Sequence, residues 1–277
     1  MTSSHEMTLI ESRGALMEVL DTLGIHRKSV VLVGAQAIYL QTLNFRSSVA
    51  AFTKDADLAL KIEGLANEPS IEIVLSRGGF TLADSKNPGQ WLTKNGIPVD
   101  LMVPASIAGA HRRRADLPSH GKLTARSTSG IEGCIVDCEL KSIDSLDPAD
   151  SRTFEIFVAG PASLLVAKTF KISDRLEDKR RLADKDAHDV YRLLSGVPME
   201  SLVDGFETLF GDPMSEEVAR IGCGYLQGLF ADGPSAQGSI RAARAEEVFG
   251  TGETIARSVS LLSEELLQNL SSKGLKI

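Results

Sequence analysis

Three aspartates stand where their carboxylates could act together on one ligand. Asp55 and Asp57 form an Asp-Ala-Asp pair within residues 53–60, where polar and apolar residues alternate. Alternate residues of a strand leave from the same face, so the pair shares one face of a predicted strand. Asp100 lies in another apolar segment, residues 97–103, where a carboxylate needs a cation or a proton. The three acids predict a divalent metal site, and Mg²⁺ is the expected ion because it prefers carboxylates with phosphate oxygens.

A glycine turn precedes the acids in the sequence. Residues 29–33 form an apolar, β-branched run that ends at Gly34, and a helix pattern without glycine or proline then begins. Backbone amides at the start of a helix point outward and bind anions, so we predict nucleotide binding at Gly34, Ala35 and Gln36. A lone Asp-x-Asp pair is more often a solvent-facing feature of an edge strand. The glycine turn and Asp100 together favour the metal site.

A second group of charged residues lies much later in the chain. Steps of about 100° per residue place Lys168, Lys171 and Arg175 on one face of a helix, where they could bind phosphate. Asp186 shares that face, but 18 residues separate it from Lys168, which is roughly 27 Å on a straight helix. Both can line one site only if the helix breaks, and we predict a break within residues 173–181. The alternative is a single solvated helix with ion pairs along it.

The densest basic run is Arg112, Arg113 and Arg114. The chain has 30 basic and 37 acidic side chains, a net charge of −7, which argues against a surface that binds nucleic acid all over. A local patch remains compatible with that charge, so this run is the predicted nucleic-acid contact. A solvated loop is the equally weighted alternative.

The order and spacing of these segments resemble the AbiEii/MenT-type nucleotidyltransferases, a type IV toxin-like branch of the polymerase-beta-like superfamily. The resemblance covers about residues 30–195. The segments that carry it are Val31-Leu-Val-Gly34-Ala-Gln-Ala37, Thr53-Lys-Asp55-Ala-Asp57-Leu, Val99-Asp100-Leu, Leu165-Val-Ala-Lys168 and Lys185-Asp186-Ala-His-Asp189.

This resemblance implies a function and roles for individual residues. It implies transfer of a nucleoside monophosphate from a nucleoside triphosphate with Mg²⁺, to the acceptor end of tRNA in toxin members, and an antitoxin protein or a silencing kinase as partner. Asp55 and Asp57 become metal ligands, Asp100 the third acid, Lys168 a triphosphate contact and Asp186 a further active-site acid. The family turn usually reads Gly-Ser or Gly-Gly, whereas this chain has Gly-Ala-Gln, which removes a hydroxyl that often touches phosphate.

The expected architecture is α/β (α+β), with the mixed sheet of a polymerase-beta-like nucleotidyltransferase and a helical C-terminal domain. The boundary is predicted at Gly160-Pro161, which gives an α/β domain over residues 1–160 and a helical domain over 161–277 that completes the active site. Within the first domain, Asn95-Gly96 predicts a two-residue hairpin turn, and residues 133–140 predict a strand.

Composition indicates the cellular compartment and leaves two alternative functions open. Three cysteines do not form a disulfide framework of the secreted kind, and we find neither a signal-peptide pattern nor an apolar run of membrane-spanning length, so a cytoplasmic protein without membrane partners is expected. Two alternatives to an RNA-directed enzyme stay open. The first is nucleotidyl transfer to a small molecule or a protein, and the second is a non-catalytic protein that binds a nucleotide or a partner.

Overall fold

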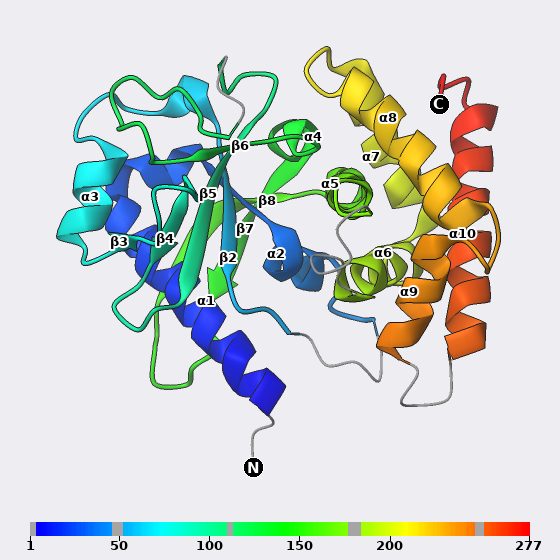
Figure 1. Ribbon diagram of the computed structural model, residues 1–277, viewed down its shortest axis with the longest axis horizontal. Helices are drawn as coiled ribbons and strands as arrows, with labels where there is room; N and C mark the ends of the chain where they lie inside the picture. The colour runs from blue at the N-terminus through cyan, green and yellow to red at the C-terminus, as the bar shows by residue number, and fades with distance from the viewer. Residues whose placement is uncertain (1–3, 46–51, 110–112, 177–183, 247–251) are drawn as a thin grey trace. The chain divides into compact units, whose positions relative to one another are not determined.

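The computed structural model describes residues 4–45, 52–109, 113–176, 184–246 and 252–277 (Figure 1). The chain divides into two compact units. The first contains residues 1–37, 50–131 and 138–159, and the second contains residues 38–49, 132–137 and 160–277. The last segment of the second unit therefore begins at Gly160, and two earlier segments of the chain also belong to that unit.

The first unit is built on a mixed sheet. Its strands are β1 (Val30–Val33), β2 (Ala56–Leu60), β3 (Thr81–Leu82), β4 (Gln90–Leu92), β5 (Pro98–Pro104), β6 (Arg126–Thr128), β7 (Cys138–Asp144) and β8 (Thr153–Ala159). In the described residues they form one eight-stranded sheet in the order β3-β4-β5-β2-β1-β8-β7, and β6 also pairs with β5. The central strands β1, β2 and β5 are almost wholly buried, as expected for strands covered on both faces.

Helices of the first unit pack on this sheet. They are α1 (Ser4–Leu23) and α3 (Ile71–Arg77), with short 3₁₀ turns η1 (Gly24–Ser29) and η2 (Ile62–Gly64). Helix α1 contacts β2, β5, β8 and α3, so it covers the middle of the sheet (Figure 1). Helix α2 (Gly34–Gln41) starts directly at the end of β1, and this strand–glycine–helix unit confirms the prediction from the sequence.

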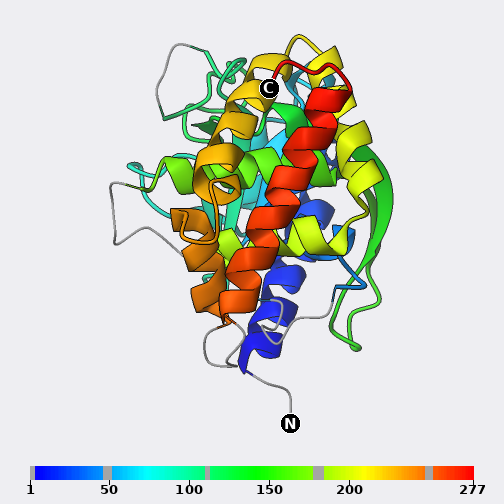
Figure 2. The same cartoon turned by 90° about the vertical axis from the view of Figure 1, so that its right-hand side faces the viewer.

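The second unit is helical. Its helices are α4 (Glu132–Val136), α5 (Pro161–Ser173), α6 (Asp184–Gly196), α7 (Met199–Gly211), α8 (Glu216–Leu226), the π-helical turn η3 (Gln227–Ala231), α9 (Gln237–Ala245) and α10 (Gly252–Ser272). Helix α5 contacts α6, α7 and α8, while α10 contacts α6, α7 and α9 and runs along the unit in Figure 2. Pro161 fits the first turn of α5 because a helix leaves its first N–H groups unpaired. Among the described helices, none is both long and apolar enough to cross a membrane.

The predicted helix break is confirmed. Helix α5 ends at Ser173, the first residue of the predicted interval, and the next helix begins at Asp184. The alternative of one continuous helix from Lys168 to Asp186 is therefore wrong.

The hairpin between β4 and β5 differs from its prediction by one residue. Thr93 donates its backbone N–H to Ile97 and pairs across a three-residue connection, in which Gly96 has φ +76°. The Thr93 hydroxyl also accepts a bond from the Ile97 N–H, which favours this closure over a two-residue turn. The resulting register pairs Gln90 with Asp100.

The prediction of a strand over residues 133–140 is wrong for its first half. Helix α4 occupies Glu132–Val136, and β7 begins only at Cys138. Cys134 is buried and its Sγ lies 3.8 Å from the Ser163 carbonyl oxygen of α5. Packing of this short turn against α5 outweighs the β propensity of its apolar residues.

Candidate active site in the first unit

The three predicted acids meet on one face of the sheet. Asp57 on β2 is the register partner of Asp100 on β5, and Asp55 precedes Asp57 by two residues. One carboxylate oxygen of each residue can be chosen so that the three oxygens lie within 4.8 Å of one another. Among the described residues, this acidic triad is the group of side chains that could hold a metal ion. Three oxygen donors of this kind fit a hard divalent cation such as Mg²⁺.

Asp55 is held at two points. Its carboxylate accepts a bond of 2.6 Å from the Thr53 hydroxyl, and its backbone carbonyl accepts a bond of 3.1 Å from the side-chain amide of Gln36. Gln36 is buried, and it also accepts a bond of 2.8 Å from Nε of Arg13 and donates to the carbonyl of Ser12. The side chain of Gln36 therefore positions Asp55 from within the core. Of the predicted nucleotide-binding groups of Gln36, only its backbone could contact a nucleotide.

Gly34 makes room for Asp57. Its φ of +70° is unfavourable for other residues, and a methyl group added there would overlap the Asp57 carboxylate. The carboxylate thus lies against Gly34, the first residue of α2, and the next residue, Ala35, is buried. This contact places the glycine turn and the acidic triad in one site.

Asp100 carries protein partners on both oxygens. Arg126 Nη1 lies 3.0 Å from Oδ2, and the Gln90 side-chain amide donates to Oδ1 over 3.2 Å. Burial raises the pKa of Asp100, the Arg126 charge opposes this rise, and the Asp55 carboxylate adds to it. The pKa of Asp100 is raised overall, because burial and a neighbouring like charge together outweigh one partly exposed guanidinium.

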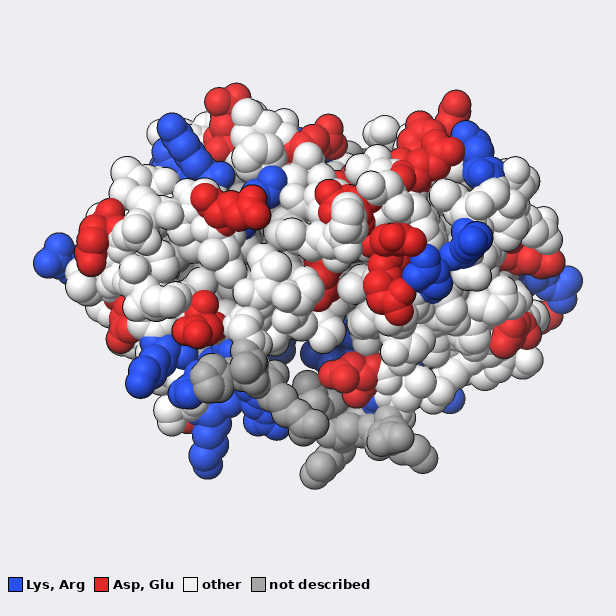
Figure 3. All heavy atoms as spheres, turned by 90° about the horizontal axis from the view of Figure 1, so that it is seen from above, with Lys and Arg blue, Asp and Glu red and all other residues white. Residues whose placement is uncertain are grey.

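The basic run lies beside the strand that supplies Arg126. Arg114 forms a β-bridge with Arg126, and the Arg113 carbonyl accepts a bond of 3.1 Å from the Ser127 N–H. Arg113 is exposed and Arg114 is half-buried, whereas Arg112 lies outside the described residues. On the face in Figure 3, acidic side chains are scattered widely, and several basic side chains gather at the lower left.

A second cluster of predicted residues forms inside the second unit. Lys168 on α5 lies 2.7 Å from Asp186 and 2.7 Å from Asp189, both on α6. Lys171 and Arg175 each lie 3.2 Å from Asp186. The three cations therefore converge on one carboxylate, and their shared face is directed at α6.

Burial shapes the charges of this cluster. Burial raises the pKa of Asp186, but the charges of Lys168, Lys171 and Arg175 outweigh it and hold that pKa well below its usual range. Burial lowers the pKa of Lys168, while Asp186 and Asp189 outweigh that effect and raise it above its usual value. The Lys168 side chain is only 5% exposed, so this ion cluster is part of the interior of the second unit. The triphosphate role of Lys168 and the active-site role of Asp186 stay predictions.

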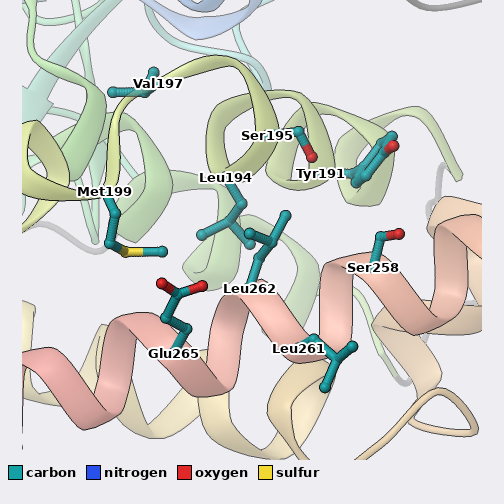
Figure 4. A pocket seen from close by; sticks show the side chains of 9 residues that line it. All are labelled: Tyr191, Leu194, Ser195, Val197, Met199, Ser258, Leu261, Leu262 and Glu265. Atoms are coloured by element: carbon teal, nitrogen blue, oxygen red, sulfur yellow. The ribbon is translucent and has the colours of Figure 1, made fainter.

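The second unit also has a surface hollow of about 570 Å³ between α6 and α10 (Figure 4). Its lining is mostly apolar, and Glu265 is the charged residue in it. None of the predicted site residues lines this hollow.

Several residues of the site were missed in the sequence. Thr53 could have been found, because it lies two residues before Asp55 in the alternating segment and so shares its predicted face. Gln90 could be placed only with the correct hairpin register, and no pattern in the sequence pointed to Arg126.

Comparison of the chain with models of known protein families, with curated proteins and with solved structures finds no match.

Proposed function

We propose that this protein is a metal-dependent nucleotidyltransferase that moves a nucleoside monophosphate from a nucleoside triphosphate to an acceptor and releases pyrophosphate. One observation carries the proposal: Asp55, Asp57 and Asp100 converge within 4.8 Å beside the glycine turn that starts α2. Three acids with a nearby anion-binding helix start suit a metal–phosphate substrate.

The three carboxylates would hold the divalent cation. When bound, such a cation neutralises charge on the phosphates and steadies the attacking and leaving oxygens of a phosphoryl displacement. Thr53 and Gln36 keep Asp55 in place, so the protein pre-orients the donor set before any ligand arrives. Pre-orientation matters because catalysis of this kind rests on positioning and electrostatic stabilisation.

The glycine turn would receive the phosphates. Backbone N–H groups at the start of α2 carry partial positive charge and need no side-chain hydroxyl to hold an anion. The change from Gly-Ser to Gly-Ala therefore leaves backbone binding intact and removes one side-chain contact. Buried Lys168 already has two carboxylate partners, so the proposal rests on the first unit alone.

The proposed acceptor is the 3′ end of tRNA, as the resemblance implies, with an antitoxin as the regulatory partner. The exposed Arg113 beside β6 supplies positive charge close to the strand that contacts the acidic triad. Phosphate contacts from such a patch would hold an RNA acceptor in spite of the negative net charge.

A labelling experiment tests the proposal. The protein is incubated with Mg²⁺, total RNA and each nucleoside triphosphate labelled at the α-phosphate, and the RNA, protein and small-molecule fractions are then separated. Label on tRNA that disappears in Asp57→Asn is the expected result. Label on protein or on small molecules would show that the acceptor is one of these and not tRNA. Nucleotide binding without any transfer would favour a non-catalytic nucleotide-binding protein.

A further inference from the structure

Arg126 stands at the edge of the acidic triad without a role in the function proposed above. Strand β6 pairs with β5 so that Arg126 faces Met102, two residues beyond Asp100 on the same face of the sheet. Its guanidinium reaches back along the strand, with Nη1 3.0 Å from Asp100 Oδ2 and Nη2 3.3 Å from Met102 Sδ. Arg126 is therefore the cation that the structure sets on the most buried member of the triad.

A guanidinium and a divalent cation are alternative counter-ions for Asp100. Three carboxylates within 4.8 Å repel one another, and Arg126 offsets part of that repulsion. A divalent cation bound to the triad would offset more of it and would also repel the guanidinium. The attraction between Arg126 and Asp100 then falls when the cation arrives.

Arg126 can leave Asp100 once a cation balances that buried carboxylate, because the guanidinium itself is not enclosed by the core. Its side chain is 35% exposed, and only Asp100 and the Met102 sulfur are hydrogen-bonded to its guanidinium in the described residues. An arginine can hold a phosphate through two parallel N–H bonds, which a lysine cannot reproduce. The neighbouring Arg113 and Arg114 add positive charge on the same side of β6.

We propose that Arg126 exchanges partners: it is the counter-ion of Asp100 before the cation binds, and a phosphate ligand of the nucleoside triphosphate afterwards. This inference rests on the proposed function, since it takes a nucleoside triphosphate as the ligand of the same site. Arg126 thereby couples the two ligands, because the cation releases the side chain that the nucleotide needs.

The test separates the two ligands and uses binding as its readout. Mn²⁺ alone is titrated by electron paramagnetic resonance, and a non-hydrolysable nucleoside triphosphate analogue is then titrated by calorimetry at saturating Mn²⁺. Arg126→Gln should bind Mn²⁺ about two- to fivefold more tightly, since a competing partly exposed charge is gone. The same variant should bind the analogue about 10- to 100-fold more weakly, since it cannot form the bonds between a guanidinium and a phosphate.

Two further variants keep the result interpretable. Arg126→Lys retains a positive charge beside Asp100 and removes the forked guanidinium donor. It should therefore bind Mn²⁺ like the wild type and bind the analogue more weakly. Arg77→Gln removes an exposed charge at the end of α3 in the same unit and should change neither affinity.

Parallel shifts of both affinities in Arg126→Gln, or no shift beyond that of Arg77→Gln, would overturn the exchange. If the wild type nevertheless transfers label, the proposed function survives that failure. A wild type that binds neither Mn²⁺ nor the analogue would overturn both.

Discussion

Asp57 and Asp100 are direct partners in the parallel register of β2 and β5, so their side chains leave the same face of the sheet next to each other. Two carboxylates so close in a largely buried sheet cost free energy unless cations share the space. Arg126 supplies one such charge on the Asp100 side. On the Asp57 side the carboxylate lies against the start of α2, where the helix dipole is positive.

Replacement of Asp57 by asparagine removes a ligand charge and keeps the side-chain volume. Loss of a side chain that only orients a metal-binding residue typically lowers metal affinity by roughly 10- to 100-fold. Asp57 would bind the metal itself, so the Mn²⁺ affinity of Asp57→Asn should fall by more than this. Stability without metal should hold or rise, because repulsion with Asp100 is relieved. Metal titration and urea unfolding check both statements. The exposed Asp21→Asn is the control, and an Mn²⁺ affinity equal to that of the control would remove Asp57 from the site.

A methyl group at Gly34 should disable the metal site through the Asp57 carboxylate. Gly34→Ala combines an unfavourable φ of +70° with overlap at Asp57, whereas Gly96→Ala has a similar φ of +76° and open space around its added methyl. Both variants should lose about 1–2 kcal/mol for the left-handed backbone. Only Gly34→Ala should also lose Mn²⁺ affinity, measured by the same titration. Equal Mn²⁺ affinities in the two variants would contradict the contact with Asp57.

Lys168 should be essential for the stability of the second unit. Lys168→Met leaves Asp186 and Asp189 buried without their shared partner, and removal of one member of a buried ion pair typically costs about 3–5 kcal/mol. Lys171→Met should cost less than about 1 kcal/mol, because the Lys171 side chain is 41% exposed and water already screens its charge. Urea unfolding of both variants measures the difference. Similar losses would show that burial of the cluster has little energetic effect.

The low pKa of Asp186 predicts acid sensitivity. A carboxyl whose pKa is lower in the folded than in the unfolded state stabilises the fold above its unfolded pKa of about 3.9, and this stabilisation is lost as the pH falls toward the folded value. The free energy of unfolding should therefore drop more steeply below about pH 4 in the wild type than in Asp186→Asn. Unfolding curves between acidic and neutral pH give both slopes, with the exposed Glu200→Gln as control. Parallel curves for wild type and Asp186→Asn would refute the expectation.

RNA binding should depend on the basic run. Changing Arg112, Arg113 and Arg114 together to alanine should weaken RNA binding and flatten its salt dependence, because fewer counter-ions are released on association. For a single-stranded acceptor the slope of log affinity against log salt should fall by about 0.7 for each phosphate that the variant no longer neutralises. Nucleotide-analogue affinity should stay within about twofold, since the backbone amides at the start of α2 and Arg126, and not these three side chains, hold the triphosphate. An unchanged salt slope would identify the run as a solvated loop.

Local patterns determined most of the elements that carry the site. Alternation predicted that Asp55 and Asp57 face the same side, although β2 begins only at Ala56 and Asp55 lies just before it. The glycine after an apolar run marked the start of α2, and the charged stretch marked the end of α5. These features depend on neighbours within a few residues, through strand alternation, backbone freedom and helix capping. Sequence periodicity reports such neighbours directly.

Register and packing decided what surrounds the acids. A two-residue turn at Asn95-Gly96 would have set Gln90 on the opposite face, because a slip of one residue reverses every side chain of a strand. The three-residue connection instead brings Gln90 to Asp100. Its closure depends on one hydroxyl and on a left-handed glycine, which alternation does not encode.

Tertiary structure alone brought Arg126 to Asp100 and turned Lys168 toward two aspartates. The first contact joins β5 to β6, and the second joins α5 to α6. Contacts between segments so distant in sequence follow from strand pairing within the first unit and helix packing within the second, and no local spacing specifies them. The amino-acid sequence by itself determined the three acids and the glycine turn, and the fold decided which charges accompany them.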